Sequence, residues 1–254
     1  MDWAWIIIPA VAFGASLLTL ISGFGLGTLM LPVFSIFFDI TTAVAMTAVV
    51  HILNNIFKTG LLGSAVDWKI LVRFGLPGIL GALAGATTLT YVAAKDDGFY
   101  AMGREFSAVS IVIGITMIVF ALSELFPKWK NLPPSPRWLV AGGLISGFFG
   151  GLSGHQGALR SVFLAKLPWS PKVYIATGVA IALLVDITRI PIYLTRVDSA
   201  QMTSEWGLLV VSVLTAFGGA YWGKKRIEKV TMNNIHLLVG WGMIAIAIMV
   251  IFSK

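Results

Sequence analysis

Residues 150–160 place a histidine, an amide and an arginine in a glycine-rich stretch between two apolar runs. Arg160 follows Gly157 by about one helical turn. If the stretch interrupts a helix inside a membrane, its backbone N–H groups and the positive end of the next helix point into a low-dielectric interior, which favours an anion. The alternative is that the glycines only permit close helix packing and that the Arg160 side chain extends to the membrane–water interface. The candidate anion-binding residues are Gly154, His155, Gln156, Gly157 and Arg160.

A second glycine-rich stretch, residues 22–27, occupies the corresponding place near the start of the sequence. It is followed by Met30 where the later stretch has Arg160, so the two stretches are not chemically equivalent and the later one is the stronger candidate. Close helix packing explains the earlier glycines equally well. The positions that could bind substrate here are Gly23, Gly25 and Gly27.

A polar stripe runs along one face of the otherwise apolar segment 41–62, where His51, Asn54, Asn55 and Lys58 recur at helical spacing. Lipid would not tolerate this face well, so we expect it to point into a helix bundle or a water-filled cavity. Substrate binding by His51 and Asn55, with Lys58 as a nearby charge, is one interpretation. A structural hydrogen-bond seam between helices is the other.

Asp186 and Arg189 lie one turn apart in the apolar segment 172–194, which suggests a buried ion pair. The pair could be structural, could hold Arg189 ready for substrate, or could let Asp186 carry a proton. Thr47 and Thr177 stand at matching places in the two halves of the sequence and could bind substrate through their hydroxyl groups. A threonine that bonds its own helix backbone is the more common case.

The composition indicates a polytopic membrane protein. Of the 254 residues, 57% are hydrophobic and 11% are charged, the mean hydropathy is +0.90, and apolar runs of about 20 residues alternate with short polar loops. The net charge of +7 then comes mostly from lysines and arginines in the loops. Their placement indicates how the protein is oriented in the membrane and does not indicate a nucleic-acid partner. The sequence has no cysteine, three scattered histidines and no serine with a convincing basic partner. It therefore predicts no metal site, no cofactor and no enzymatic activity.

Aligning the sequence with itself at a shift of 130 residues, and later of 138, superimposes special residues in order, including Gly27 on Gly157. This predicts two repeats, residues 1–130 and 131–254. Each is expected to hold a glycine-tipped helical hairpin, or two short helices, followed by three transmembrane helices. An odd number of crossings makes the repeats antiparallel, so the expected fold class is all-α with two inverted-topology repeats. The hairpins are placed at about 3–38 and 137–167, and the transmembrane helices at about 41–62, 69–93, 105–126, 172–194, 206–223 and 235–252.

The loop charges predict an orientation. If both termini lie outside, most lysines and arginines of the loops fall on the inner side, as the positive-inside rule requires. We therefore expect a multi-pass protein of the cell inner (plasma) membrane, with its N-terminus and C-terminus outside. The expected partners are the lipid bilayer and a small anionic substrate, with no nucleic acid, and a homodimer is left open.

A resemblance to a known family rests on the order of several short motifs. They are the glycine-rich stretches 22–27 and 151–161, the Met46-Thr47 and Ala176-Thr177 steps that follow them, and Asp67-Trp68. In this order, and with the duplication, they resemble the sulfite exporter TauE/SafE family over nearly the whole chain. The resemblance implies a permease that moves sulfite, sulfoacetate or related organosulfonates across bacterial inner membranes. It points to the two glycine stretches and to His155, Gln156 and Arg160.

These observations together favour a secondary transporter of small sulfur-containing anions (sulfite, an organosulfonate or a related oxyanion) that works by alternating access. Proton coupling is a further hypothesis, motivated by His51, His155 and Asp186 inside the membrane segments. An anion channel is the main alternative, because polar helix breaks and an arginine suit a pore as well. A membrane protein without transport activity is a third interpretation.

Overall fold

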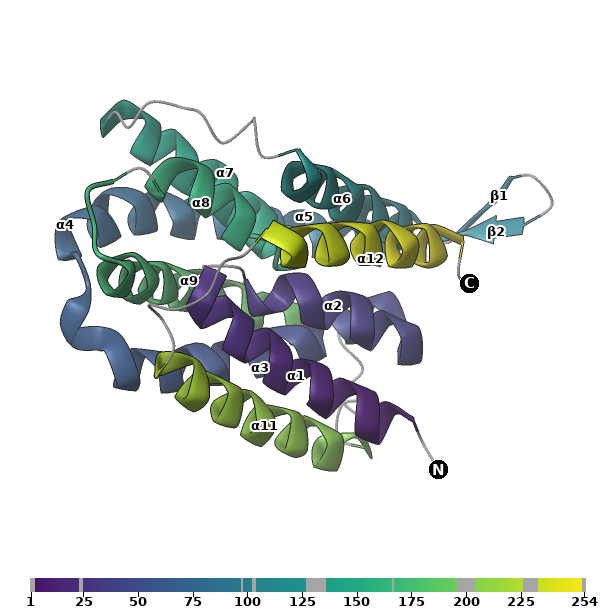
Figure 1. Ribbon diagram of the computed structural model, residues 1–254. Helices are drawn as coiled ribbons and strands as arrows, with labels where there is room; N and C mark the ends of the chain where they lie inside the picture. Colours follow the sequence, from purple (N-terminus) through teal and green to yellow (C-terminus); the bar gives the residue numbers. More distant parts are fainter. Residues whose placement is uncertain are drawn as a thin grey trace.

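The computed structural model describes residues 3–22, 25–96, 98–101, 104–126, 136–165, 167–195, 204–225 and 233–252. Over these residues the chain is a bundle of α-helices, which confirms the predicted all-α class apart from one short β-hairpin (Figure 1). The N-terminal part forms α1 (Ala4–Ser22), α2 (Leu26–Phe37), α3 (Ile40–Leu62), the 3-10 turn η1 (Gly63–Ala65), α4 (Trp68–Ile70), the π-helical segment η2 (Leu71–Gly75), α5 (Leu76–Ala94), the strands β1 (Phe99–Ala101) and β2 (Arg104–Phe106), and α6 (Ala108–Leu125). The C-terminal part forms α7 (Pro136–Ser153), α8 (Gly157–Leu164), α9 (Pro171–Tyr193), α11 (Trp206–Lys224) and α12 (Asn233–Phe252).

Long apolar helices make the chain a multi-pass membrane protein. Their outward faces carry exposed leucines such as Leu80, Leu83 and Leu214, which suit contact with lipid and not with water. In the part of the chain that the structure describes, the helices long and apolar enough to cross a membrane are Ile40–Ala65, Trp68–Ala94, Pro171–Tyr193 and Trp206–Lys224.

Two helices are interrupted at the glycine-rich stretches. The first break separates α1 from α2, and the second separates α7, which ends at Ser153, from α8, which begins at Gly157. In the second break, Gly154 has a φ of +82°, a left-handed conformation that favours glycine and ends α7. Helix α8 has 8 residues. At 1.5 Å per residue it is about 12 Å long, too short to cross a hydrocarbon layer of about 30 Å.

Side-chain caps fix where α3 and α9 begin, directly after these interrupted helices. The carboxylate of Asp39 accepts the backbone N–H of Thr42 at 3.0 Å, and the hydroxyl of Ser170 accepts the backbone N–H of Val173 at 3.4 Å. Each cap provides an acceptor for an N–H group that the first helical turn leaves without a partner. Helices α3 and α9 therefore start in the same way, and both run past the helix breaks.

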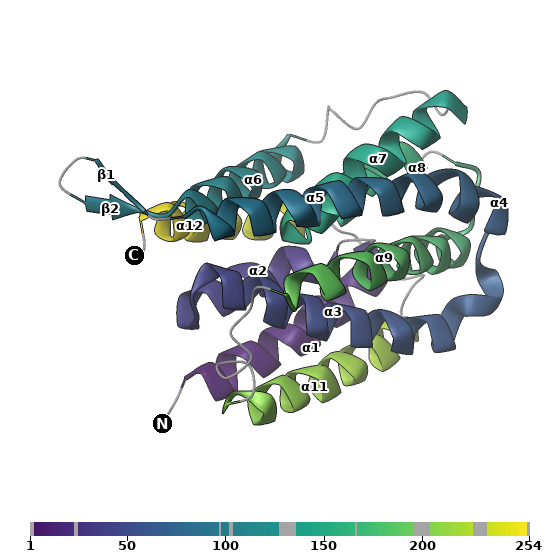
Figure 2. The same cartoon turned by 180° about the vertical axis from the view of Figure 1, so that it is seen from behind.

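Helices of the N-terminal part pack against helices of the C-terminal part in four main pairs: α1 with α11, α5 with α7, α3 with α9, and α6 with α12 (Figures 1 and 2). In the α5–α7 pair, a Cβ atom on Gly81 or Gly85 would overlap the backbone of Leu144 or Phe148. A Cβ atom on Gly219 would likewise overlap the backbone of α1. These glycines are close-packing positions between helices.

Local structure explains two of the departures of the helix boundaries from the predicted ranges. Helix α6 begins at Ala108 rather than near residue 105, because the preceding residues form the β1–β2 hairpin, in which Tyr100 pairs with Glu105. The helix predicted at 69–93 starts with α4 and the π-helical η2 before α5 continues it. The border between the predicted repeats, near residue 130, lies outside the described residues, and the division into repeats stays a prediction.

Candidate functional site

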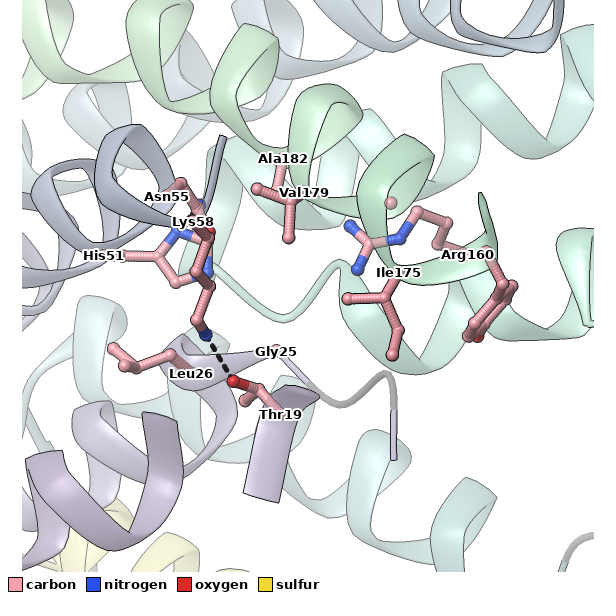
Figure 3. Close-up of a pocket in the computed structure, with 12 residues that line it drawn as sticks. Thr19, Gly25, Leu26, His51, Asn55, Lys58, Arg160, Ile175, Val179 and Ala182 are labelled. Atoms are coloured by element: carbon pink, nitrogen blue, oxygen red, sulfur yellow. Dashed lines mark hydrogen bonds between the residues drawn. The ribbon is translucent and has the colours of Figure 1, made fainter. Parts of the chain in front are cut away.

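A narrow cavity lies among α1, α2, α3, α8 and α9 (Figure 3). Its empty volume is about 380 Å³, including the part that is open at its mouth. The interior is constricted and has room for about one water molecule. The cavity is lined by Thr19, Gly25, Leu26, His51, Asn55, Lys58, Arg160, Tyr174, Ile175, Gly178, Val179 and Ala182. The structure thus brings together five of the predicted site residues: Gly25, His51, Asn55, Lys58 and Arg160.

Arg160 reaches the cavity from the first turn of α8. Its guanidinium lies against α9, where a Cβ atom on Gly178 would be 3.1 Å from Nε of Arg160, so glycine provides the space for this side chain. Arg160 is 6% exposed, and its Nη1 atom has no hydrogen-bond partner. No carboxylate among the described residues forms an ion pair with it. A buried guanidinium without a counter-charge is costly, which makes Arg160 a candidate ligand for an anion.

Lys58 reaches the cavity from α3, on the side opposite Arg160 (Figure 3). It is 2% exposed, and its ammonium group donates to the hydroxyl of Thr19 at 2.5 Å. The Thr19 hydroxyl in turn donates to the carbonyl oxygen of Ser16 at 2.9 Å. Within the described part of the chain, Lys58 also forms no ion pair with a carboxylate. The cavity therefore contains two buried cationic side chains, from two different helices, without a counter-charge.

A buried polar network joins α3 to α9 beside the cavity. Nδ1 of His51 lies 2.6 Å from Oδ2 of Asp186, and Nδ2 of Asn55 donates to the same oxygen at 2.9 Å. The other carboxylate oxygen, Oδ1, accepts Nε of Arg189 at 3.0 Å and lies 2.9 Å from its Nη2. Both oxygens of Asp186 are therefore occupied. The polar stripe of α3 faces the bundle interior, and Asp186 links it to the Arg189 ion pair.

Arg189 and Tyr193 hold the second helix break in place. Nη1 of Arg189 donates to the carbonyl oxygen of Gly150 at 3.2 Å, and the Tyr193 hydroxyl donates to the carbonyl oxygen of Gly151. Both carbonyl groups belong to the last turn of α7, where a helix runs out of its own N–H donors. Neither Arg189 nor Asp186 lines the cavity, and their contacts connect the second helix break to the His51 side chain.

The two helix breaks touch each other beside the cavity. A Cβ atom on Gly25 would lie 3.6 Å from the backbone nitrogen of Gly157, and one on Gly27 would lie 3.1 Å from the carbonyl oxygen of Gly154. Of these four glycines, Gly25 is the one that lines the cavity. The observed positions of Gly27, Gly154 and Gly157 show close approach of the two backbones. Gly23 lies outside the described residues.

His155 and Gln156 are fully buried, but they do not line the cavity. The imidazole of His155 stacks on the ring of Phe120 from α6, with centroids 5.4 Å apart and planes at 15°, and its Nδ1 lies 3.0 Å from the hydroxyl of Ser153. Nε2 of His155 and both side-chain amide atoms of Gln156 have no hydrogen-bond partner in the structure. Their substrate-binding role stays a prediction, and contact with a ligand in the cavity would require another conformation.

The two matching threonines have different surroundings. Thr177 accepts the backbone N–H of Asp67 at 2.9 Å and so ties α9 to the segment before α4. Thr47 is 1% exposed, lies beside Gly27, and has a hydroxyl without a hydrogen-bond partner. Neither threonine lines the cavity, and their role in binding stays a prediction.

Thr19, Tyr174 and Gly178 line the cavity but were not among the predicted site residues. Thr19 lies near the end of the apolar α1, and nothing in its sequence surroundings distinguishes it. Tyr174 and Gly178 are spaced one helical turn apart on α9, so together they mark one face, but their chemistry is common in membrane helices. Their placement beside Arg160 is a property of the folded structure.

The described residues contain no group of three or more His, Cys, Asp or Glu side chains that could hold a metal ion.

Interrupted helices inside an apolar bundle, with unpaired cations in the cavity beside the breaks, are features of membrane transporters. The match to a known family agrees, since residues 8–250 fit the sequence model of the family described as sulfite exporter TauE/SafE. The match spans nearly the whole chain, and the protein therefore belongs to the TauE/SafE family and is a membrane transporter. Among curated proteins, none matches the chain.

Proposed function

We propose that this protein is a secondary transporter that moves a small sulfur-containing anion, such as sulfite or an organosulfonate, across the cytoplasmic membrane. The observation that carries the proposal is the placement of Arg160 and Lys58. They enter one cavity from α8 and α3, both buried and neither with a carboxylate partner among the described residues. The family description supplies the sulfur chemistry, and the two cations supply the reason for a negative charge to bind.

The cost of the two buried charges predicts how the protein responds to its ligand. An unpaired lysine or arginine at the centre of a membrane segment costs about 3 kcal/mol. An anion between them offsets part of this cost, and it does so only in the folded protein. Binding should therefore raise the stability of the fold, by about 2.7 kcal/mol at a ligand concentration 100 times the Kd.

The interrupted helices add to the positive potential of the cavity. Arg160 lies in the first turn of α8, so its guanidinium acts beside the positive end of that helix. Gly25, which lines the cavity, is the N-cap residue of α2, so the positive end of a second short helix lies there too. Secondary transporters use discontinuous helices in this way to bind anionic groups of their substrates.

The packing of the bundle supports a duplicated fold, and the proposed inverted repeat and alternating access build on that duplication. Each of the four main helix pairs joins one helix from the N-terminal part to one from the C-terminal part, as a two-fold related duplication would. Helix α1 begins and α12 ends at the same end of the bundle, which fits both termini outside the cell (Figure 1). Rocking of one part against the other would expose the cavity to the two sides in turn.

His51 gives the proposal a testable extension, which is coupling to protons. It lines the cavity and also contacts Asp186, so a proton on its ring would interact with an anion in the cavity. Anion flux that responds to an imposed pH gradient in proteoliposomes, and loses that response in His51→Gln, would support coupling. Flux that ignores the gradient would contradict coupling while leaving anion transport intact.

Ligand-dependent stability tests the binding site directly. The purified protein is heated with sulfite, thiosulfate, taurine, sulfoacetate or sulfate, and the melting temperature is compared with that of the protein alone. At least one sulfur anion should raise it, and Arg160→Ala should lose the effect. The matched control is Arg73→Ala, because Arg73 is an exposed arginine in η2, away from the cavity. An unchanged response in Arg160→Ala would contradict the site.

A flux experiment distinguishes the proposed carrier from a channel. Proteoliposomes loaded with unlabelled anion should take up labelled anion faster than empty ones, because a carrier returns more readily when it is loaded. A channel would show no such acceleration. Acceleration that is absent in Arg160→Ala but present in Arg73→Ala would assign the exchange to the cavity.

A further inference from the structure

The cavity presents its two cations on separate walls and from separate helices. Figure 3 shows the guanidinium of Arg160 and the ammonium group of Lys58 on opposite sides of the space, with Ile175 and Val179 of α9 beside it. The chemistry of the two groups also differs, because a guanidinium offers a planar fork of donors and an ammonium is a compact point charge. Each cation is therefore a position for one negative group, and because the interior has room for about one water molecule, a ligand that contacts both cations requires a wider cavity than the one observed.

The Lys58 ammonium group is held in place by α1. It donates to the hydroxyl of Thr19 at 2.5 Å, and that hydroxyl is itself anchored on the Ser16 carbonyl oxygen. A lysine has three donors, and this hydrogen bond uses one of them. The remaining donors of Lys58 are thus available at the wall of the cavity, where the side chain is one of the lining residues.

The nearby carboxylate cannot serve as an acceptor for a positively charged ligand group. Asp186 is 0% exposed and does not line the cavity, and its oxygens are bound by His51, Asn55 and Arg189. The cavity lining itself contains no aspartate or glutamate. An ammonium group placed in this cavity would face two cations and no anion, which is strongly unfavourable in a low-dielectric site.

We infer that the substrate is a small anion with two negatively charged groups, one bound by Arg160 and the other by Lys58, and that zwitterionic sulfonates with an ammonium group are excluded. This inference rests on the proposed function and narrows its substrate class. Three two-carbon sulfonates differ mainly in the second group and serve as probes. Sulfoacetate carries a carboxylate there, isethionate a neutral hydroxyl, and taurine an ammonium group.

The test measures the apparent Kd of each probe by titrated thermal shift on the intact protein in detergent. We expect sulfoacetate to bind at least about tenfold more tightly than isethionate, because a second charge pair a few ångströms apart is worth more than that factor in a partly buried site. Taurine should give no shift at the highest concentration used. Lys58→Met should weaken sulfoacetate to the level of isethionate and leave isethionate within about twofold.

Two controls separate loss of recognition from loss of folding. The melting temperature of Lys58→Met without ligand should be equal to or above that of the wild type, because the change removes an unpaired buried charge. Lys69→Met removes an exposed lysine of α4 and should leave all three affinities unchanged. Both controls use the full chain, so each affinity is measured on protein shown to be folded.

The outcomes distinguish this inference from the function on which it rests. Taurine binding as tightly as sulfoacetate, or Lys58→Met weakening all probes by the same factor, would overturn the two-group substrate while anion transport stands. In that case Lys58 would only stabilise the end of α1. Absence of a shift with every probe and with sulfite would overturn both proposals.

Discussion

The imidazole of His51 lies 2.6 Å from the carboxylate of Asp186, and this contact joins α3 to α9 at the centre of the bundle. Asp186 also binds Arg189, whose guanidinium reaches the carbonyl oxygen of Gly150 at the end of α7. One buried carboxylate therefore connects a residue of the cavity wall to the second helix break. A change at Asp186 should affect both the stability of the fold and the geometry of the cavity.

Asp186→Asn is expected to destabilise the protein by about 3 to 5 kcal/mol, because it leaves Arg189 buried without a counter-charge. The melting temperature in detergent, or the yield of folded protein, measures the loss. The double variant Asp186→Asn with Arg189→Met should recover much of the stability, since it contains no unpaired charge at this place. Equal losses of stability in the single and double variants would mean that the unpaired charge of Arg189 does not cause the destabilisation.

Helical spacing was sufficient to predict the shared face of His51, Asn55 and Lys58, because the period of 3.6 residues is a property of the helix itself. It could not identify the partner of that face. Asp186 is separated from His51 by 135 residues, and only the packing of α3 on α9 brings them together. The positions of Lys58 and Arg160 on opposite sides of one cavity are likewise a result of tertiary packing.

The glycine-rich composition of residues 154–157 indicated a helix break, and the structure has one there. Composition did not indicate where the side chains of the break point. His155 stacks on Phe120, which comes from α6, so its orientation depends on a contact distant in sequence. The β1–β2 hairpin also had no strong local signal, since its strands have three residues each.

Gly85→Ala and Gly14→Ala form a matched pair that tests the close packing of α5 on α7. A Cβ atom on Gly85 would overlap the carbonyl oxygen of Phe148, so we expect a loss of about 1 to 3 kcal/mol, as for other overpacked sites. A Cβ atom on Gly14 would meet nothing within 4 Å. That variant should gain up to about 1 kcal/mol from the helix propensity of alanine. The melting temperatures of both variants, compared with that of the wild type, test this prediction. Equal changes in the two variants would contradict the observed packing.

Arg160→Met should abolish anion binding without lowering the stability of the ligand-free protein. Removing a buried guanidinium without a counter-charge is expected to leave the stability of the ligand-free protein unchanged or to raise it by up to about 2 kcal/mol. The same change should abolish stabilisation by sulfite or sulfoacetate. Melting curves with and without ligand measure both effects. A large loss of stability without ligand would show that Arg160 has a structural partner and would weaken its assignment to the substrate.

Asp96, in the loop after α5, caps the start of α6. Its carboxylate accepts the hydroxyl of Ser107 at 2.5 Å and the backbone N–H groups of Ala108 and Val109 at 2.7 and 3.1 Å. Burial alone would raise the pKa of Asp96. The hydrogen bonds from Ser107, Val109, Ala108 and Gly98 outweigh this effect and hold the pKa below its ordinary value.

The lowered pKa of Asp96 predicts a pH-dependent contribution to stability. Because the folded protein favours the charged carboxylate, the contribution is complete above the ordinary pKa of about 3.9 and is lost as the pH falls through the lower folded value. Asp96→Asn should therefore cost about 1 kcal/mol, typical of a helix cap, at pH 5 to 8 and progressively less below about pH 4. Melting curves across this range measure it, with Lys95→Met as the control because Lys95 is the exposed neighbour that bonds Tyr91 instead. A difference between wild type and Asp96→Asn that stays constant down to pH 2 would show that the charge of Asp96 does not stabilise the start of α6.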